Sequence, residues 1–301
     1  MTTDPDSARG FGTAAAPRRI EEVLTDAGLL ACWHVRDVDG EAELGRSADA
    51  PVATASVHKL FLVTTLFREA AAGRVDPTAA VELPPGDRSP GGTGLSAMRD
   101  AARLSLRDLA SLAVAVSDNA AADVLWDHVG MDTVNRTVAE LGLRHTVSAQ
   151  RYGELVASVA EDAGEGGAAA LLDPASPVRV RALDPGAGNR STARDTTALL
   201  ASVWRGEACA GPWGEELLRV LGLQTWQHRL ASGFPFDDVR VSGKTGSLLS
   251  LRHEAGVVEY PDGRRYAVAF FTRSLSPALA QPRADSAIGT AARLAVDALR
   301  G

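Results

Sequence analysis

The sequence of 301 residues contains little of what metalloproteins and disulfide-rich proteins depend on. It has two cysteines, Cys32 and Cys209, without a CxxC pair, and its six histidines form no HxH or HExxH motif. Because metal centres are usually built from such closely spaced ligands, we expect neither a metal site nor a cofactor. The cysteines are interpreted as separate small buried thiols, and a disulfide between them is the less favoured alternative.

Long apolar stretches and basic clusters are also lacking. No segment approaches the roughly 18 apolar residues of a membrane-spanning helix, and the first residues contain no apolar run of signal-peptide length. We therefore expect a cytoplasmic protein without a membrane partner, or a secreted or periplasmic one whose export signal is missing from this sequence. The net charge of -7 and the absence of Lys/Arg runs argue against nucleic acid as a partner. A monomer is expected.

The composition is that of a globular domain. Hydrophobic residues make up 45% and charged residues 23%, whereas aromatic residues make up only 5%. Aliphatic and alanine-rich packing must therefore form most of the core. We expect residues 1–17 to be a disordered leader and residues 18–301 to form a single domain.

The expected elements run in the order strands, helices, strands. Helices are expected at residues 17–27, 56–72, 106–116, 120–129, 132–141, 196–204, 215–221 and 284–299, and strands at 29–38, 41–45, 239–251, 254–260 and 265–272. Residues 144–190, with several glycines and Asp-Pro pairs, are expected to be a long loop-rich excursion. Because βαβ crossovers are absent, we predict an α+β fold. An antiparallel sheet flanked by helices is formed by both chain ends (about 18–50 and 190–301), and an all-helical lobe (about 51–189) is inserted.

The first of three short motifs is Ser-Val-His-Lys at residues 56–59, where a stretch begins that is apolar on nearly every side. Ser56 would open a buried helix, whose positive end stabilises a developing oxyanion. Lys59 lies on the same helix face, and a buried lysine near another cation has a lowered pKa that lets it take the serine proton. Taken alone, the pair is more simply an N-cap and a surface lysine.

The second motif is Ser-Asp-Asn at residues 117–119, between two expected helices. Its simpler interpretation is a helix start, since all three residues are good N-caps. In the functional interpretation, the Ser117 hydroxyl relays a proton to the leaving group and Asn119 hydrogen-bonds the substrate amide.

The third motif is Lys-Thr-Gly at residues 244–246, on an expected strand. Lys244 and Thr245 would bind a substrate carboxylate. Gly246 would let the substrate approach the strand edge, and Ser247 would supply a second oxyanion N–H. The simpler interpretation is a strand with a glycine bulge. A phosphate-binding P-loop is rejected, because Asp238 stands where that motif requires glycine.

Together, SxxK, SDN and KTG in this order resemble the class A β-lactamase-like serine hydrolases over about residues 20–300. Residues 189–200 and 244–258 are similar to stretches of that family as well. The resemblance implies the fold predicted above and a penicillin-recognising serine enzyme. In it, Ser56 is acylated by a β-lactam or an acyl-D-alanyl substrate, with Lys59 as its activator.

The chain departs from this family at the step that releases the acyl group. Class A β-lactamases carry an ExxLN motif whose glutamate activates the deacylating water, and no ExxLN occurs here. Glu154 is the nearest carboxylate and the candidate for this role, with an exposed loop residue as the simpler interpretation. Three functions stay open: a β-lactamase, a related D-alanyl peptidase, esterase or acyltransferase, and a β-lactam-binding protein that acylates without efficient turnover. His58 and His253 are interpreted as packing residues.

Overall fold

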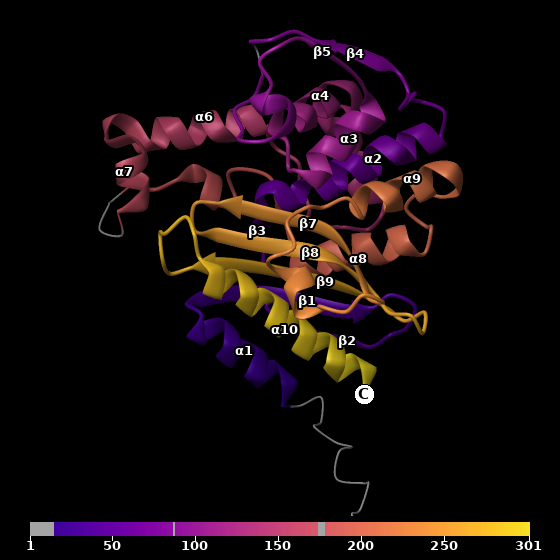
Figure 1. Cartoon of the computed structure of the whole chain (residues 1–301), viewed down its shortest axis with the longest axis vertical. Coiled ribbons are helices and arrows are strands. Elements are labelled where there is room, and N and C mark those ends of the chain that lie inside the picture. Colours follow the sequence, from indigo (N-terminus) through magenta and orange to yellow (C-terminus); the bar gives the residue numbers. More distant parts are fainter. Residues whose placement is uncertain (1–14, 87, 174–177) are drawn as a thin grey trace, which may run out of the picture.

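The computed structural model describes residues 15–86, 88–173 and 178–301. Its central element is a five-stranded antiparallel sheet with the strand order β2-β1-β9-β8-β7 (Figure 1). The strands are β1 (Leu29–Asp37), β2 (Glu43–Arg46), β7 (Arg240–Leu248), β8 (Leu251–Glu259) and β9 (Arg265–Ser274). Leu29 of β1 lies opposite Ser274 of β9, so the two ends of the chain close the sheet as predicted.

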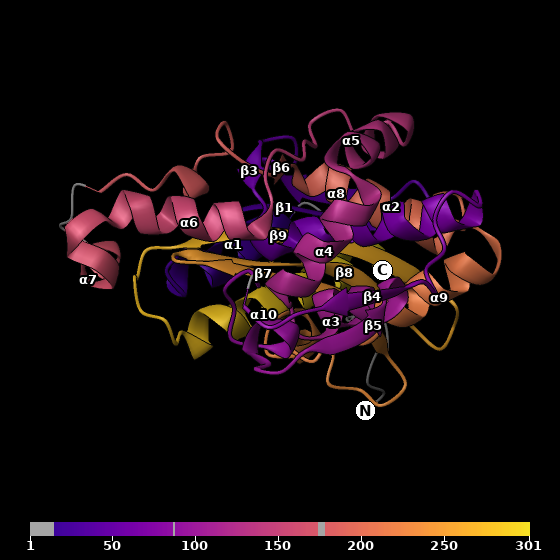
Figure 2. The same ribbon diagram turned by 90° about the horizontal axis from the view of Figure 1, so that it is seen from above.

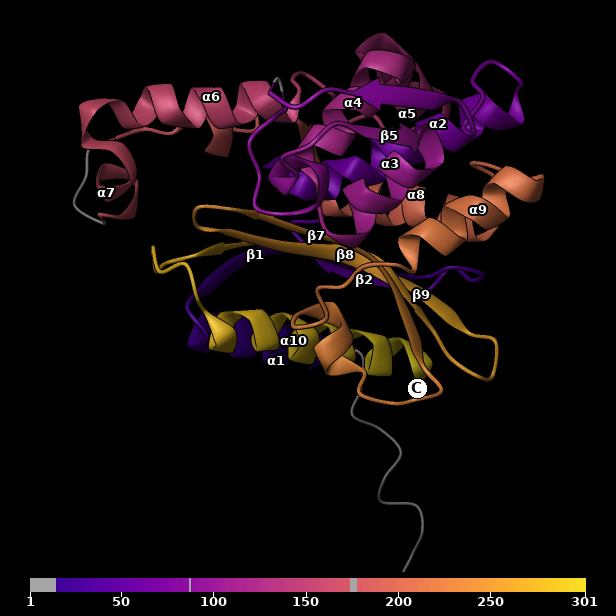
Figure 3. The same cartoon turned by 45° about the horizontal axis from the view of Figure 1, so that its top comes forward.

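Both faces of the sheet are covered, which explains why its central strands are almost entirely buried. In β9, Tyr266, Val268 and Phe270 pack with α1 (Ala16–Asp26) and α10 (Pro282–Arg300). The alternate residues, including Ala267 and Phe271, belong to the core of the opposite face. This alternation follows from the two-residue period of a strand. Figure 3 shows α1 and α10 side by side beneath the sheet, with the other helices above it.

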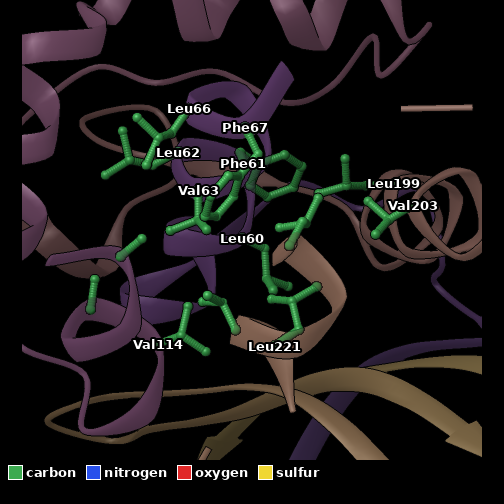
Figure 4. Close-up of a cluster of buried hydrophobic side chains, with 14 of the residues drawn as sticks. Leu60, Phe61, Leu62, Val63, Leu66, Phe67, Val114, Leu199, Val203 and Leu221 are labelled. Carbon is green, nitrogen blue, oxygen red and sulfur yellow. The ribbon is translucent and has the colours of Figure 1, made fainter. Parts of the chain in front are cut away.

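The buried helix predicted from the apolar stretch is α2 (Lys59–Ala71). Around it pack α3 (Leu106–Ala115), α4 (Asn119–Val129), α5 (Met131–Glu140) and α9 (Gly211–Leu221), while α8 (Ala193–Trp204) contributes to the same core. Figure 4 shows this core, in which Val114, Leu199, Val203 and Leu221 surround the apolar side chains of α2. Gly73 follows with φ of 70°, a left-handed conformation that ends the helix where expected.

The prediction of a long loop-rich excursion over residues 144–190 is wrong for its middle part, residues 152–172. Residues Tyr152–Ala163 form α6 and Gly167–Leu172 form the short α7, which extend beyond the sheet (Figure 2). The start of α6 has no local Ser, Thr, Asp or Asn cap. The free N–H groups of its first two residues are instead bound by the carboxylate of Asp123 on α4. This is a tertiary contact, which cannot be predicted from the local sequence.

Smaller differences concern element ends. The strand predicted over residues 239–251 is divided, because β7 ends at Leu248 and a turn with Leu249 in a left-handed conformation leads into β8. Short strand pairs were missed: β3 (Val52–Ala53) with β6 (Arg190–Ser191), and β4 (Ala80–Leu83) with β5 (Ala102–Ser105). Helix α1 begins inside the expected leader, whose residues 1–14 lie outside the described part of the chain.

The structure also bears on the expectations for the cysteines and for membrane-spanning helices. Cys32 and Cys209 are both free thiols, and Cys209 is buried whereas Cys32 is half-buried. Within the described ranges, none of the helices is both long enough and apolar enough to cross a membrane.

Candidate active site

Ser56 lies at the junction of the sheet and the helices above it. It occupies the 3₁₀ turn Ala55–His58 directly ahead of α2, and not the first turn of the α-helix as expected. The turn is tight, because Ala55 has φ of 45°, in the left-handed region. Ser56 is partly exposed, whereas its neighbours Ala55 and Val57 are buried.

Strand β7 holds this turn by close backbone contact. A Cβ atom on Gly246 would lie 3.0 Å from the carbonyl oxygen of Thr54 and 3.1 Å from the backbone nitrogen of Val57. Only glycine allows the strand to come this near without displacement. Gly246 is therefore required by the approach of β7 to the turn that carries Ser56, whatever it does toward a substrate.

The amine of Lys59 brings the first two motifs together. Its Nζ donates to the backbone oxygen of Ser117 at 2.7 Å and to Oδ1 of Asn119 at 2.9 Å. The hydroxyl oxygens of Ser56 and Ser117 each lie 3.4 Å from the same nitrogen. Three of the predicted site residues, Ser56, Ser117 and Asn119, thus meet around the amine of Lys59.

Burial lowers the pKa of Lys59 from its ordinary value to about 7, although the nearby carboxylates of Asp118 and Asp123 act in the opposite direction. Burial, one of the two causes that the sequence interpretation gave, is the main one, and the neighbouring cation is not among the causes of the shift. A lysine with this pKa is about half neutral at neutral pH, so it can accept a proton from Ser56.

The backbone around the second motif is strained. Ser117 has φ of 60°, which is uncommon for a residue with a side chain. Asp118, not Ser117, is the N-cap of α4: its carboxylate accepts the N–H of Ala121. Both ends of the Asn119 amide make hydrogen bonds, because Oδ1 accepts from Lys59 and Nδ2 donates to the carbonyl of Pro90 at 3.0 Å. Asn119 therefore ties Lys59 to the loop over the site.

In the third motif, Lys244 is completely buried and donates to the carbonyl of Thr245 at 2.8 Å. Burial, and secondly the charge of Lys59, hold the pKa of Lys244 well below its ordinary range. Ser247 is exposed at the end of the motif. Lys59 and Lys244 are the only lysines in the chain, and every other strong base is arginine. Lysine, unlike arginine, loses its proton readily when buried.

Sequence reasoning missed Arg229, which supports the third motif from behind. This arginine is 2% exposed and donates to the carbonyls of Gly246 at 3.2 Å and His253 at 2.9 Å. It also binds the hydroxyl of Ser247 at 2.7 Å and the carboxylate of Asp285 at 2.7 Å. No sequence signal connects these residues, since a single arginine in a loop is normally a surface residue.

A second supporting group, also missed, is Glu254. Its carboxylate accepts hydrogen bonds from the side-chain amide of Gln224 and from the N–H of Leu230. Burial raises the pKa of Glu254 to about 7. The carbonyl of Gln224 then accepts the N–H of Thr245 at 2.6 Å. The pair fixes the backbone of the third motif.

The structure does not bring Glu154 to this cluster. Its side chain is exposed and accepts the N–H of Arg151 at 2.8 Å, which is a helix cap. Two residues earlier, and about 200° around the helix, Tyr152 faces the site instead. The Tyr152 ring centroid lies 4.3 Å from Nζ of Lys59.

The two histidines beside the motifs make internal contacts. His58 is buried between the hydroxyls of Thr54 and Ser148, and burial lowers its pKa to about 3. Nδ1 of His253 accepts the N–H of Thr272, and its Nε2 contacts the carbonyl of Ala53. Across the described part of the chain, no group of three or more His, Cys, Asp and Glu residues could hold a metal ion.

The chain is similar to known proteins over nearly its whole length. The model of the Beta-lactamase enzyme family matches residues 15–299. The chain is 35% identical over 303 residues to the β-lactamase regulatory protein BlaB of Streptomyces cacaoi, and this match covers 94% of the chain and 97% of that relative.

Solved structures agree on the fold. The β-lactamase from Sphaerobacter thermophilus DSM 20745 is 27% identical with a TM-score of 0.75, over 96% of this chain and 97% of that one. A PBP-A mutant in an acyl-enzyme complex with penicillin G is 20% identical with a TM-score of 0.76, over 95% and 97%, and this likeness shows the fold alone. The family match, the curated relative and the shared fold lead to one conclusion: the chain belongs to the β-lactamase enzyme family.

Proposed function

We propose that the protein forms a covalent acyl-enzyme at Ser56 with β-lactams or related small acyl substrates. The observation that carries this proposal is the buried Lys59 amine, within 3.4 Å of the hydroxyls of both Ser56 and Ser117. One group with a pKa of about 7 can therefore take a proton from the nucleophile and return it toward the leaving group.

The steps follow from these positions. The Ser56 hydroxyl loses its proton to Lys59 as Oγ attacks the carbonyl carbon of the lactam. The backbone N–H groups of Ser56 and Ser247 stabilise the oxyanion. The carbon–nitrogen bond then breaks, and the proton passes from Lys59 through the Ser117 hydroxyl to the leaving nitrogen. The ring-opened ligand stays attached to Ser56 as an ester.

None of the described carboxylates near Lys59 is placed to act as a separate base for release of the acyl group. Asp118 and Asp123 are the carboxylates that act on Lys59, but both accept backbone N–H groups: those of Leu95 and Ala121 for Asp118, and that of Tyr152 for Asp123. Glu154 is an exposed cap. These contacts favour acylation with slow turnover over rapid β-lactam hydrolysis. A stable adduct also suits a sensing role, which is consistent with the regulatory name of the relative from Streptomyces cacaoi.

A chromogenic cephalosporin tests the proposal when absorbance and intact protein mass are followed together. We expect one adduct per protein and few further turnovers. Ser56→Ala should form no adduct, because Oγ is the attacking atom. Labelling that persists in Ser56→Ala, or no adduct in the wild type, would refute the assignment. Many turnovers would keep Ser56 as nucleophile and show that the release step has a base of its own.

A further inference from the structure

Tyr152, the first residue of α6, lies beside the amine of Lys59, and no hydrogen bond of its hydroxyl to a described residue accounts for this position. Its side chain is 2% exposed, and its hydroxyl has no hydrogen-bond partner among the residues that the structure describes. A buried hydroxyl without a partner is unfavourable. The hydroxyl therefore does not explain this position, and the contact with the site is made by the aromatic ring, whose centroid lies 4.3 Å from Nζ of Lys59.

The chain holds this ring in place through its backbone. Asp123 on α4 is 3% exposed, and its carboxylate accepts the N–H groups of Tyr152 and Gly153, both at 2.7 Å. The hydroxyl of Ser89 donates to the same carboxylate. A Cβ atom on Gly153 would lie 2.9 Å from that hydroxyl, so a larger residue there would displace the Ser89 side chain from its contact with Asp123. Helix α6 thus starts at a fixed distance from α4 and from Lys59.

The groups around the Lys59 amine differ in kind, and the Tyr152 ring is the aromatic one among them. The oxygens of Ser56, Ser117 and Asn119 receive its hydrogen bonds. The charged groups that act on the site are Asp118 and Asp123 from α4 and its cap, and Lys244 from β7. The Tyr152 ring, from α6, lies with its face over the amine, where it occupies space beside Nζ and also attracts the charged form of the amine.

Hydrolysis of an ester at Ser56 requires a water next to a base. The water oxygen forms a bond to the ester carbon, the water proton passes to the base, and the bond to Oγ breaks as Ser56 regains a proton. Lys59 is the base within reach of Oγ. A water can use it only if there is space beside the amine.

We propose that Tyr152 is a positioning residue that keeps water away from the Lys59 amine and so makes the Ser56 ester long-lived. The proposal rests on the proposed acylation of Ser56 and names the residue that controls how long the product lasts. It also predicts that the ring keeps Lys59 poorly solvated before any ligand binds.

Tyr152→Ala and Tyr152→Phe form a matched pair for the test. Phenylalanine keeps the ring, and the lost hydroxyl had no partner among the described residues, so the adduct lifetime should be unchanged. Alanine removes the ring, and the lifetime measured by intact mass should shorten on the order of 10²-fold, as water gains access to the base. Circular dichroism checks that both variants fold. Equal lifetimes in the alanine variant and the wild type would overturn the proposal.

A second readout does not depend on acylation. Because the chain contains two lysines, protein labelled with ¹³C at the lysine ε-carbon gives two side-chain signals, and Lys59→Met assigns them. In Tyr152→Ala, solvation raises the titration midpoint of Lys59 and loss of the ring's attraction for the charged amine lowers it; because burial is the first cause of the lowered pKa, we expect a net rise, whereas Tyr152→Phe should match the wild type. If the wild type forms no adduct, the proposed acylation fails but this titration still decides whether the ring covers the amine. Equal midpoints in all three proteins would refute the covering role.

Discussion

At the scale of single residues, the site depends on how two lysines lose their solvation. Lys59 and Lys244 are both fully buried, and burial is the first cause of the lowered pKa in each. Arginine at either position would stay charged, and its planar group would not fit the contacts of a compact amine. The restriction of lysine to these two positions is a sequence feature that marks the site without any motif.

The lowered pKa of Lys59 predicts how acylation should depend on pH. In the proposed acylation the neutral form of Lys59 is the base, so the acylation rate should rise with pH and reach half its maximum near the pKa of about 7. Labelling with a fluorescent penicillin between about pH 5 and 9 measures the curve, with Ser56→Ala as the blank. A rate that does not change over this range would exclude Lys59 as the proton acceptor.

At the scale of elements, the site lies where strand β7, the turn Ala55–His58 and the starts of α2 and α4 come together. Strand β7 touches the turn that carries Ser56 because Gly246 has no side chain. Helix α4 begins at the second motif, where the strained Ser117 turns its carbonyl and hydroxyl toward Lys59. Small displacements of any of these elements change the distances on which proton transfer depends.

Gly246→Ala tests the contact between β7 and the turn. The new Cβ would press on backbone atoms of Thr54 and Val57, so the two elements should separate by a few tenths of an ångström. We expect acylation to slow on the order of tenfold and the free energy of unfolding to fall by about 1–2 kcal/mol. Gly92→Ala is the control, because its Cβ meets nothing within 4 Å. Equal effects of the two substitutions would contradict this account.

Substitutions of Arg229 and Asp285 test how far this ion pair stabilises β7. Arg229→Met leaves a carboxylate that is 7% exposed without its cation, and we expect a loss of about 3–5 kcal/mol in the free energy of unfolding. Combining it with Asp285→Leu should cost less than the sum of the two single changes. Urea denaturation of the four proteins gives the coupling directly. Additive losses would mean that the ion pair does not act as a unit.

At the scale of the whole molecule, the sheet separates two apolar cores. One core fills the space between the sheet and the helices around α2, and the other lies between the sheet and the pair α1 and α10. Strand β9 contributes alternate residues to both, so neither core is independent of the other. The Ser56 site therefore shares its stability with residues on the far face of the sheet.

Ile288→Ala on α10 tests this coupling. Ile288 is fully buried in the core beneath the sheet, and its truncation should lower the free energy of unfolding by about 2–5 kcal/mol. Helix signal and the ability of Ser56 to be labelled should disappear at the same, lower denaturant concentration. Labelling that survives after the helix signal is lost would show that the two cores unfold separately.

Much of the fold could be predicted from the sequence because its signals are local. Alternation in the terminal strands and the all-round apolar stretch of α2 report burial directly, and Gly73 marks a helix end. The error over residues 144–190 arose where the signal is not local: α6 is capped by Asp123 of α4, which lies 29 residues before Tyr152 with α5 between them. The glycines and Asp-Pro pairs there indicated a loop when considered without that partner.

For the site, the sequence alone determined the chemical groups and their order: Ser56 with Lys59, then Ser117 with Asn119, then Lys244 with Thr245. Spacing and residue type are sufficient for this, since each pair occupies one turn or one strand. Only the tertiary structure decided which carboxylates are bound by backbone N–H groups, which arginine supports β7, and that Tyr152 rather than Glu154 faces the amine. Those outcomes depend on burial and on the docking of α6 against α4, which join residues far apart in the chain.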